Sequence, residues 1–178
     1  MIYTPAEINK KLVKVFGPKK NFFSMPRLNK VVLNYRVPEA RESQEALLAA
    51  EKELMAIAGQ KPRLTRSKKS ISTFKLRQND PLALKVTLRG KRMYQFVEKL
   101  FNLVLPQLRD FKGMSNTAFD QNGNYSLTIR DQTYFPEVNL NIVSKIRSLE
   151  VTLNISAASV ADSKMLLSTL GFPFQKQP

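Results

Sequence analysis

Four short segments in which apolar and polar residues alternate constrain the fold of this chain most. They lie at residues 28–36, 82–90, 125–130 and 149–155. In LALKVTLRG (82–90), Leu84, Val86 and Leu88 fall on one face, whereas Lys85, Thr87 and Arg89 fall on the other. A period of two is typical of a strand with one buried face. The pattern therefore predicts four strands, each with an aliphatic face and a polar face.

Amphipathic helices are predicted between these strands. Apolar residues recur with helical spacing from Thr4 to Gly17, over about 42–58, over 91–105 and from near Asp162 to Gly171, and a fifth short strand is expected near 63–66. Helices that cover the aliphatic face of a sheet give an α+β fold. No linker rich in Gly, Ser or Pro divides the chain. Residues 1–178 are therefore predicted to form a single domain, with protruding loops at about 66–81 and 109–145.

The charge of the chain is concentrated in its middle third. The net charge is +15, and residues 59–112 carry 14 Lys or Arg against three Asp or Glu, whereas residues 113–178 carry five of each kind. One sign of charge at this density repels itself unless a polyanion lies against it. Nucleic acid is the first candidate and an anionic membrane surface the second. The polar face of the sheet is then either a platform for a phosphate backbone or simply a solvated surface.

The segment GQKPRLTRSKKSISTFKLRQNDP (59–81) carries most of this charge. It holds seven Lys or Arg residues, and its one acidic residue is Asp80. Such a segment is typical of phosphate binding, to which its Ser and Thr hydroxyls add hydrogen bonds, although it could also be a solvated loop. After the short strand we expect a mobile loop over 70–81. Phe74 either stacks on a base or sugar, or packs into the core.

Catalytic and metal-binding chemistry has little support. The chain has no Cys and no His, and it contains neither a Gly-rich phosphate loop nor a metal-ligand spacing. A carboxylate metal site of Asp110, Asp120 and Asp131 is conceivable, but each is more simply a turn or cap residue. We predict no enzyme, no cofactor and no metal. No apolar run approaches the roughly 18 residues that span a membrane. An enzyme that needs only Lys and Asp stays open.

Several motifs, in order, resemble one known family. They are MPRLNKVVLNY, the basic segment 59–81, LKVTLRGKRMYQF, LPQLRDFKGMSNTAFDQNGNYSLTIRDQTYFPE and LGFPF. Together they resemble the large-subunit ribosomal protein family that binds 5S ribosomal RNA in the central protuberance, in its bacterial and organellar branch. The resemblance covers about residues 5–174. It implies a mostly antiparallel sheet with helices on one face and 5S rRNA against the other.

The resemblance also implies which residues bind RNA. Positions of the family that contact 5S rRNA correspond to Asn34, Gln60 and Thr87. The cationic residues beside them complete the predicted RNA-binding set: Arg36, Lys61, Arg63, Arg66, Lys68, Lys69 and Arg89.

Two further contacts follow from the family. The loop over 70–81 resembles one that reaches peptidyl-site tRNA, which makes Ser72, Phe74, Lys75 and Arg77 candidates. The excursion over about 110–145 resembles the bridge to a protein in the small-subunit head, with candidates Arg109, Lys112, Asn122 and Tyr134. Large-subunit rRNA and the neighbouring central-protuberance proteins are the other expected partners.

The chain departs from the family pattern at two glycines. The Gly-x-Gly that usually follows the first-strand Asn is replaced by Tyr35-Arg36-Val37, so the RNA contact there is expected either to be altered or to move to Arg36. A later family Gly is Ser148. This drift favours a mitochondrial ribosome, with a bacterial cytoplasm or a plastid stroma as alternatives. A non-ribosomal basic RNA-binding module and an anionic-membrane binder are the competing functions.

Overall fold

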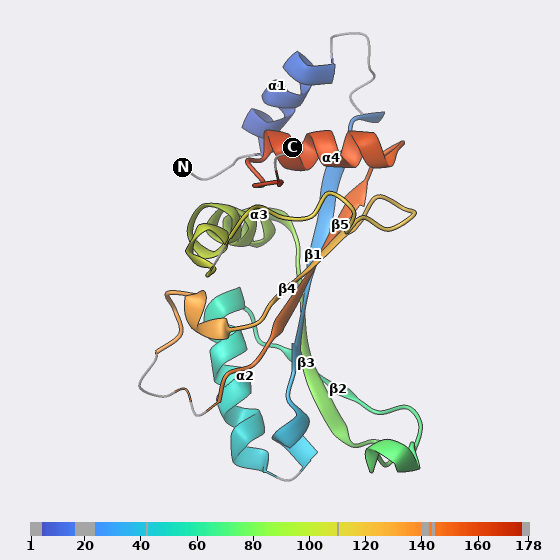
Figure 1. The fold of residues 1–178 in the computed structure, drawn as a ribbon, viewed down its shortest axis with the longest axis vertical. Helices are drawn as coiled ribbons and strands as arrows, with labels where there is room; N and C mark the ends of the chain where they lie inside the picture. Colours follow the sequence, from blue (N-terminus) through green and yellow to red (C-terminus); the bar gives the residue numbers. More distant parts are fainter. Residues whose placement is uncertain are drawn as a thin grey trace. The chain divides into compact units, whose positions relative to one another are not determined.

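The computed structural model describes residues 5–16, 24–41, 43–109, 111–139, 143 and 145–175. The strands are β1 (Arg27–Arg36), β2 (Arg63–Arg66), β3 (Pro81–Leu88), β4 (Tyr125–Ile129) and β5 (Leu149–Ser156) (Figure 1). They form one five-stranded antiparallel sheet in the order β2-β3-β1-β5-β4. The α+β prediction and all five predicted strands are confirmed.

The described helices also follow the predicted pattern. They are α1 (Pro5–Phe16), α2 (Gln44–Ala58), α3 (Gly90–Lys99) and α4 (Val160–Thr169). Ser43 caps α2 through its side chain, and Gly59 ends that helix in the left-handed conformation. The α3 helix continues through a π turn (Leu100–Val104) and a 3-10 turn (Leu105–Gln107). Three other 3-10 turns, at Pro38–Arg41, Ser72–Phe74 and Gln132–Tyr134, were not predicted from the sequence. None of the described helices has the length and apolar character needed to cross a membrane.

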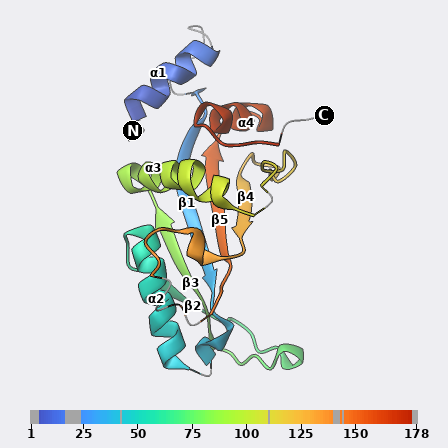
Figure 2. The same cartoon turned by 60° about the vertical axis from the view of Figure 1, so that its left-hand side comes forward.

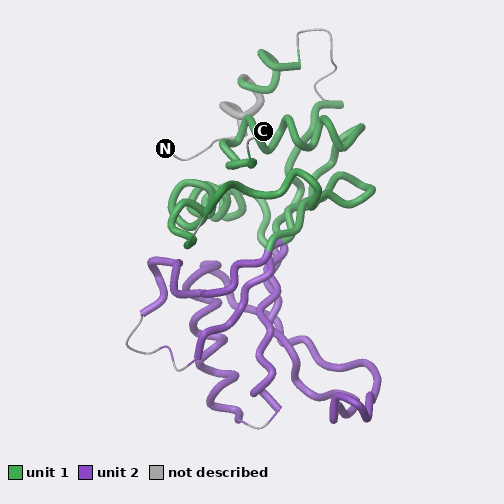
Figure 3. Tube along the Cα trace, viewed as in Figure 1, with its two compact units in different colours: residues 1–31, 88–127, 152–178 green, residues 32–87, 128–151 purple. Residues whose placement is uncertain are grey.

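The chain forms two compact units (Figure 3). Unit 1 comprises residues 1–31, 88–127 and 152–178, and unit 2 comprises residues 32–87 and 128–151. The boundaries between the units fall inside or at the end of β1, β3, β4 and β5. The strands thus contribute residues to both units, and the single-domain assignment stays a prediction.

In unit 2, α2 covers one face of the strands (Figure 2). The β1 side chains alternate, with Leu33 and Tyr35 fully buried and Arg36 exposed. The buried face of α2 presents Ala50, Leu54 and Ile57, as the helical spacing predicts. The hydroxyl of Tyr35 donates to Glu53 of α2 at 2.6 Å, so this is the face that the helix covers. The polar residues of the same strands therefore lie on the other face.

Unit 1 has a core rich in aromatic residues. The Phe172 ring meets the rings of Phe101 and Tyr125 edge to face, with centroids 4.9 Å apart in each pair, an arrangement that stabilises aromatic clusters. Phe119 and Phe174 extend this cluster. In α4, Leu166 and Leu167 are buried whereas Met165 is exposed.

Candidate nucleic-acid interface

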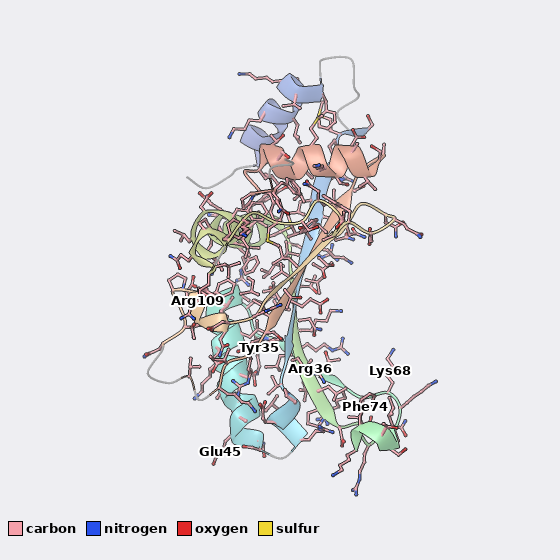
Figure 4. The ribbon with its side chains drawn as sticks, viewed as in Figure 1. Tyr35, Arg36, Glu45, Lys68, Phe74 and Arg109 are labelled. Carbon is pink, nitrogen blue, oxygen red and sulfur yellow. The ribbon has the colours of Figure 1, made fainter. Side chains whose placement is uncertain are left out.

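The polar face of unit 2 brings cationic side chains from neighbouring strands together. Arg63 of β2 lies directly opposite Lys85 of β3 in the antiparallel register, and both side chains are exposed. Cross-strand partners lie about 5 Å apart at Cβ and share a face, so two like charges are held side by side. Arg36 is exposed near the end of the adjacent strand β1 (Figure 4). This surface, formed by Asn34, Arg36, Arg63, Lys85 and Thr87, is called the cationic strand face below.

Asn34 has a defined orientation on the cationic strand face. Its amide nitrogen donates to the carboxylate of Glu150 on β5 at 3.1 Å, and the side chain is half-buried. The alternation of residues placed both side chains on the polar face. It could not show that β5 would pair beside β1, so the role of Glu150 was missed. The carboxylate fixes the donor side of the amide, which leaves the amide oxygen turned away from Glu150.

A buried ionic network lies on the opposite face of β1. The Arg147 side chain is 3% exposed, and its Nη1 lies 3.3 Å from Glu53 Oε2, the same oxygen that accepts a hydrogen bond from the Tyr35 hydroxyl. Its Nε lies 3.8 Å from Glu39 Oε2, which is too long for a hydrogen bond. Lys145 contacts the other oxygen of Glu39 at 2.5 Å, and this hydrogen bond is the main cause that lowers the pKa of Glu39. The network therefore anchors β1 to α2 and to the segment before β5.

The corner between α2 and β2 positions the Gln60 region. The backbone N–H of Gly59 donates to the carbonyl of Met55 at 2.9 Å, with φ at +62°. Gln60 follows as a half-buried residue, and Pro62 is buried. The Lys61 ammonium lies 3.9 Å from Glu51, although its side chain is largely exposed. The turn therefore leaves Lys61 at the surface just before β2.

The segment 66–81, expected to contain a mobile irregular loop, is closed by its own hydrogen bonds. Ile71 and Leu76 exchange two backbone hydrogen bonds of 2.9 and 3.0 Å, and the Ser72–Phe74 turn lies between them. The Ser70 hydroxyl accepts from the backbone of Gln78 at 3.0 Å, and Arg66 donates to the carbonyl of Asn79 at 2.9 Å. These bonds depend on left-handed residues, Lys75 and Asn79, which no period in the sequence indicates.

The loop presents its charged and aromatic side chains outward. Phe74 is 70% exposed, so it does not pack into the core, which was one of the two positions that the sequence left open. Ser72, Lys75 and Arg77 are also exposed, as are Lys68 and Lys69 nearer β2 in the sequence. Figure 4 labels Phe74 and Lys68 on this loop. An exposed ring flanked by cations is suited to stacking on a base while phosphates are neutralised beside it.

The remaining predicted site residues do not all lie in unit 2. Arg89 is exposed at the N-terminus of α3 in unit 1, as are Arg109, Lys112 and Asn122 elsewhere in that unit. Tyr134 is half-buried in the Gln132–Tyr134 turn of unit 2. The four bridge candidates are thus divided between the units.

The carboxylates considered for a metal site have structural roles where they are described. Asp120 accepts hydrogen bonds from the backbone N–H groups of Asn122 and Asn124, and Asp131 caps the Gln132–Tyr134 turn. Asp110 lies outside the described residues. Among the residues that are described, no group of three or more His, Cys, Asp or Glu is arranged to hold a metal ion.

Comparison with known proteins assigns the chain to a family. Residues 21–77 match the family model described as ribosomal protein L5, and residues 81–174 match the model of the ribosomal L5P family C-terminus. The "Large ribosomal subunit protein uL5" of Caldanaerobacter subterraneus subsp. tengcongensis is 48% identical over 170 residues, which cover 96% of this chain and 94% of that protein. The protein of the same name from Thermus aquaticus is 46% identical over 170 residues, covering 96% and 93%.

A third relative, from Dehalococcoides mccartyi, is 50% identical over 157 residues, covering 88% of each chain. All three relatives are bacterial, so the expected mitochondrial location has no support. The two missing family glycines, on which that expectation rested, are local substitutions and do not identify a compartment. The chain belongs to the ribosomal protein L5 family, and it is a structural, rRNA-binding constituent of the large ribosomal subunit rather than an enzyme.

Proposed function

We propose that this chain binds 5S rRNA through the cationic strand face of unit 2. The observation that carries the proposal is the pairing of Arg63 with Lys85 in the strand register, where two exposed like charges share one face. Neighbouring like charges on a sheet are destabilising unless an anion lies against them. A phosphate backbone supplies that anion, and the loss of condensed counterions adds to the affinity.

The proposed contacts divide into two kinds. Asn34, Gln60 and Thr87 are half-buried polar side chains, suited to bases or riboses of a folded RNA whose narrow major groove excludes direct readout. The cationic residues are exposed and suited to phosphates, which fix register rather than sequence: they are Arg36, Lys61, Arg63, Arg66, Lys68, Lys69 and, in unit 1, Arg89.

The other two contacts are proposed from the loops. The tip of the 66–81 loop, with Ser72, Phe74, Lys75 and Arg77 at its surface, meets peptidyl-site tRNA. Arg109, Lys112, Asn122 and Tyr134 meet a protein of the small-subunit head, and neighbouring central-protuberance proteins pack beside the chain. The exposure of Phe74 supports the tRNA contact. A large apolar ring left in water at a loop tip is stabilised when it stacks on a base.

Site-directed crosslinking tests the RNA contact. The chain contains no Cys, so a single cysteine introduced at Arg63 or Lys85 carries one photoreactive group. We expect crosslinks from both positions to map to 5S rRNA after sequencing of the RNA bound in assembled large subunits. Lys52→Cys on the exposed side of α2 is the matched control, and it should give few 5S crosslinks. Crosslinks from Arg63→Cys and Lys85→Cys that map to polypeptide or lipid alone would disprove the proposal.

A further inference from the structure

Arg41 joins the tip of the 66–81 loop to a distant part of the chain. It is the last residue of the Pro38–Arg41 turn after β1. Its Nη1 lies 3.2 Å from the carbonyl oxygen of Phe74 and 3.2 Å from that of Lys75, both in unit 2. Its Nε lies 3.5 Å from the carbonyl of Pro38, within its own turn. One guanidinium therefore binds two consecutive carbonyls more than 30 residues away.

The two carbonyls flank the bend of the loop. Lys75 has φ +49° and ψ +37°, a left-handed conformation that side-chain-bearing residues rarely adopt. The Phe74 carbonyl belongs to the peptide before Lys75, and the Lys75 carbonyl belongs to the peptide after it. Hydrogen bonds from a charged donor to both peptides oppose relaxation of the bend. A strained residue of this kind persists only where its surroundings hold it.

The other hydrogen bonds nearest the tip are internal to the loop. The Ile71–Leu76 pair and the Ser70–Gln78 bond close the loop on itself, because both partners of each bond belong to the loop. Arg41 instead comes from the turn that follows β1, the strand that carries Asn34 and Arg36. Its bonds tie the orientation of Phe74 and Lys75 to the cationic strand face.

We propose that Arg41 is a positioning residue, which holds the loop tip in the orientation in which Phe74, Lys75 and Arg77 meet RNA. The inference rests on the proposed tRNA contact of this loop. Arginine suits the role because its planar group carries several donors in a fixed geometry, whereas a lysine ammonium is a compact charge on a flexible stem. The role therefore depends on hydrogen-bond geometry as well as on charge.

Amide hydrogen exchange tests the clamp without RNA. The reporters are the N–H groups of Lys75, bonded to Ser72, and of Leu76, bonded to Ile71. In Arg41→Ala we expect both to exchange about tenfold faster, because charge-assisted hydrogen bonds of the native tip are lost. In Arg41→Lys the exchange rates of both amides should lie between those of the natural protein and of Arg41→Ala. Lys52→Ala, which removes an equal charge from α2, should leave both rates unchanged. Unchanged protection of both amides in Arg41→Ala would overturn the inference.

Binding of deacylated tRNA to the peptidyl site tests the positioning role. Ribosomes would carry each variant as their only copy of this chain, with Phe74→Ala, Lys75→Ala and Arg77→Ala combined as the tip variant. We expect Arg41→Ala to weaken binding severalfold in the natural background and to have no further effect in the tip variant, because Arg41 acts through the tip. An equal loss in both backgrounds would make Arg41 an independent RNA contact and overturn the inference.

The two measurements separate the inference from the function beneath it. If the tip variant weakens tRNA binding while Arg41→Ala leaves amide exchange unchanged, the positioning role fails and the tRNA contact stands. If Arg41→Ala accelerates exchange while the tip variant binds tRNA normally, the tRNA contact fails, and Arg41 holds a loop with another use. Urea unfolding of Arg41→Ala and Arg41→Lys establishes beforehand that both variants fold.

Discussion

Tyr35 shows how one residue separates the two faces of β1. Its neighbours Asn34 and Arg36 belong to the cationic strand face, whereas its own ring is fully buried against α2. Burial, and next the hydrogen bond to Glu53, raises the pKa of Tyr35 well above its ordinary value. The phenol is therefore neutral near pH 7 and donates a hydrogen bond to the carboxylate.

Tyr35→Phe should destabilise the fold moderately. The variant removes one hydrogen bond to a carboxylate that still has Arg147 as its partner, so we expect a loss of about 1–2 kcal/mol in the free energy of unfolding. Arg147→Met should cost more, about 3–5 kcal/mol, because Glu53 is left as a nearly buried charge. Urea unfolding at pH 7 measures both values. Tyr94→Phe, at a tyrosine whose pKa is raised by burial alone, is the matched control. Equal losses for Tyr35→Phe and Arg147→Met would contradict this account.

Gly123 and Ser163 form a second informative pair, in unit 1. Gly123 has φ +78°, and a Cβ at this position would lie 2.4 Å from the Ser163 hydroxyl oxygen. That hydroxyl is buried, and it has no hydrogen-bond partner among the described residues. Gly123→Ala should therefore lower the free energy of unfolding by about 1–3 kcal/mol through backbone strain and the clash.

The double variant Gly123→Ala with Ser163→Ala tests the clash directly. Removal of the hydroxyl leaves the nearest Ser163 atom at 3.4 Å, so part of the loss should return and only the backbone strain should remain. Ser163→Ala alone should be neutral or slightly stabilising, because the hydroxyl is buried without a hydrogen bond. Thermal or urea unfolding of the four proteins gives the coupling energy. Strictly additive effects would show that the two residues do not touch.

At the scale of elements, the turn 120–124 depends on one carboxylate. Asp120 accepts from the backbone N–H groups of Asn122 and Asn124 and from the Asn124 side chain, and Asn124 in turn accepts from Asn154 and the backbone of Ile155 on β5. The hydrogen bond from the Asn124 side chain is the main cause that lowers the pKa of Asp120. The charged carboxylate therefore fastens the turn to the sheet.

The stability of this turn should fall with acid. Because the folded pKa of Asp120 lies below its unfolded value, its contribution is fully present above the unfolded pKa of about 3.9 and is lost as the pH falls through the folded pKa. Asp120→Asn should flatten the pH dependence of unfolding below about pH 4. Denaturant unfolding between pH 3 and pH 7 measures this slope. If Asp120→Asn lost stability below about pH 4 as steeply as the natural protein, Asp120 would not be the source of this pH dependence.

The elements also show how far the sequence could predict the fold. Strict alternation identified β1, β3, β4 and β5, because every second residue must enter the core. Helix 91–105 was predicted as a single α-helix, but its last part forms a π turn. Pro106 has no N–H and so cannot donate to Asn102 as a residue of a regular α-helix would. The N–H of Leu105 bonds to Leu100, five residues back, which is the spacing of a π turn. A hydrophobic stripe continues through such a change, so the period did not reveal it.

The candidate site was predictable by residue type but not by contact. The basic composition and strand period placed Asn34, Thr87 and the cations of segment 59–81 on polar surfaces. In the structure Asn34 and Thr87 are half-buried and these cations are exposed, as that placement requires. The pairing of Arg63 with Lys85, the contact of Asn34 with Glu150 and the reach of Arg41 depend on strand order and on turns between distant segments. No local pattern contains that information.

At the scale of the whole molecule, whose net charge is +15, the number of phosphate contacts governs how RNA binding responds to salt. Each phosphate contact contributes about 0.9 to the slope of log affinity against log salt concentration. Lys68→Ala with Lys69→Ala should therefore make the slope for 5S rRNA shallower by up to about 2. Lys14→Ala with Lys52→Ala removes the same charge from α1 and α2 and should leave the slope nearly unchanged. Filter binding between about 50 and 300 mM salt compares the variants. An equal change in both pairs would mean that overall charge, rather than contact, determines the affinity.

The side-by-side placement of Arg63 and Lys85 also bears on the lifetime of unassembled copies. In the proposed complex RNA lies against both residues and relieves their repulsion. RNA then stabilises the folded form, by an amount that grows with the logarithm of its concentration over the dissociation constant. Copies synthesised in excess of their RNA keep this penalty and unfold more often. We expect proteases that act on unfolded chains to remove this surplus first, which would couple the abundance of the protein to that of its RNA.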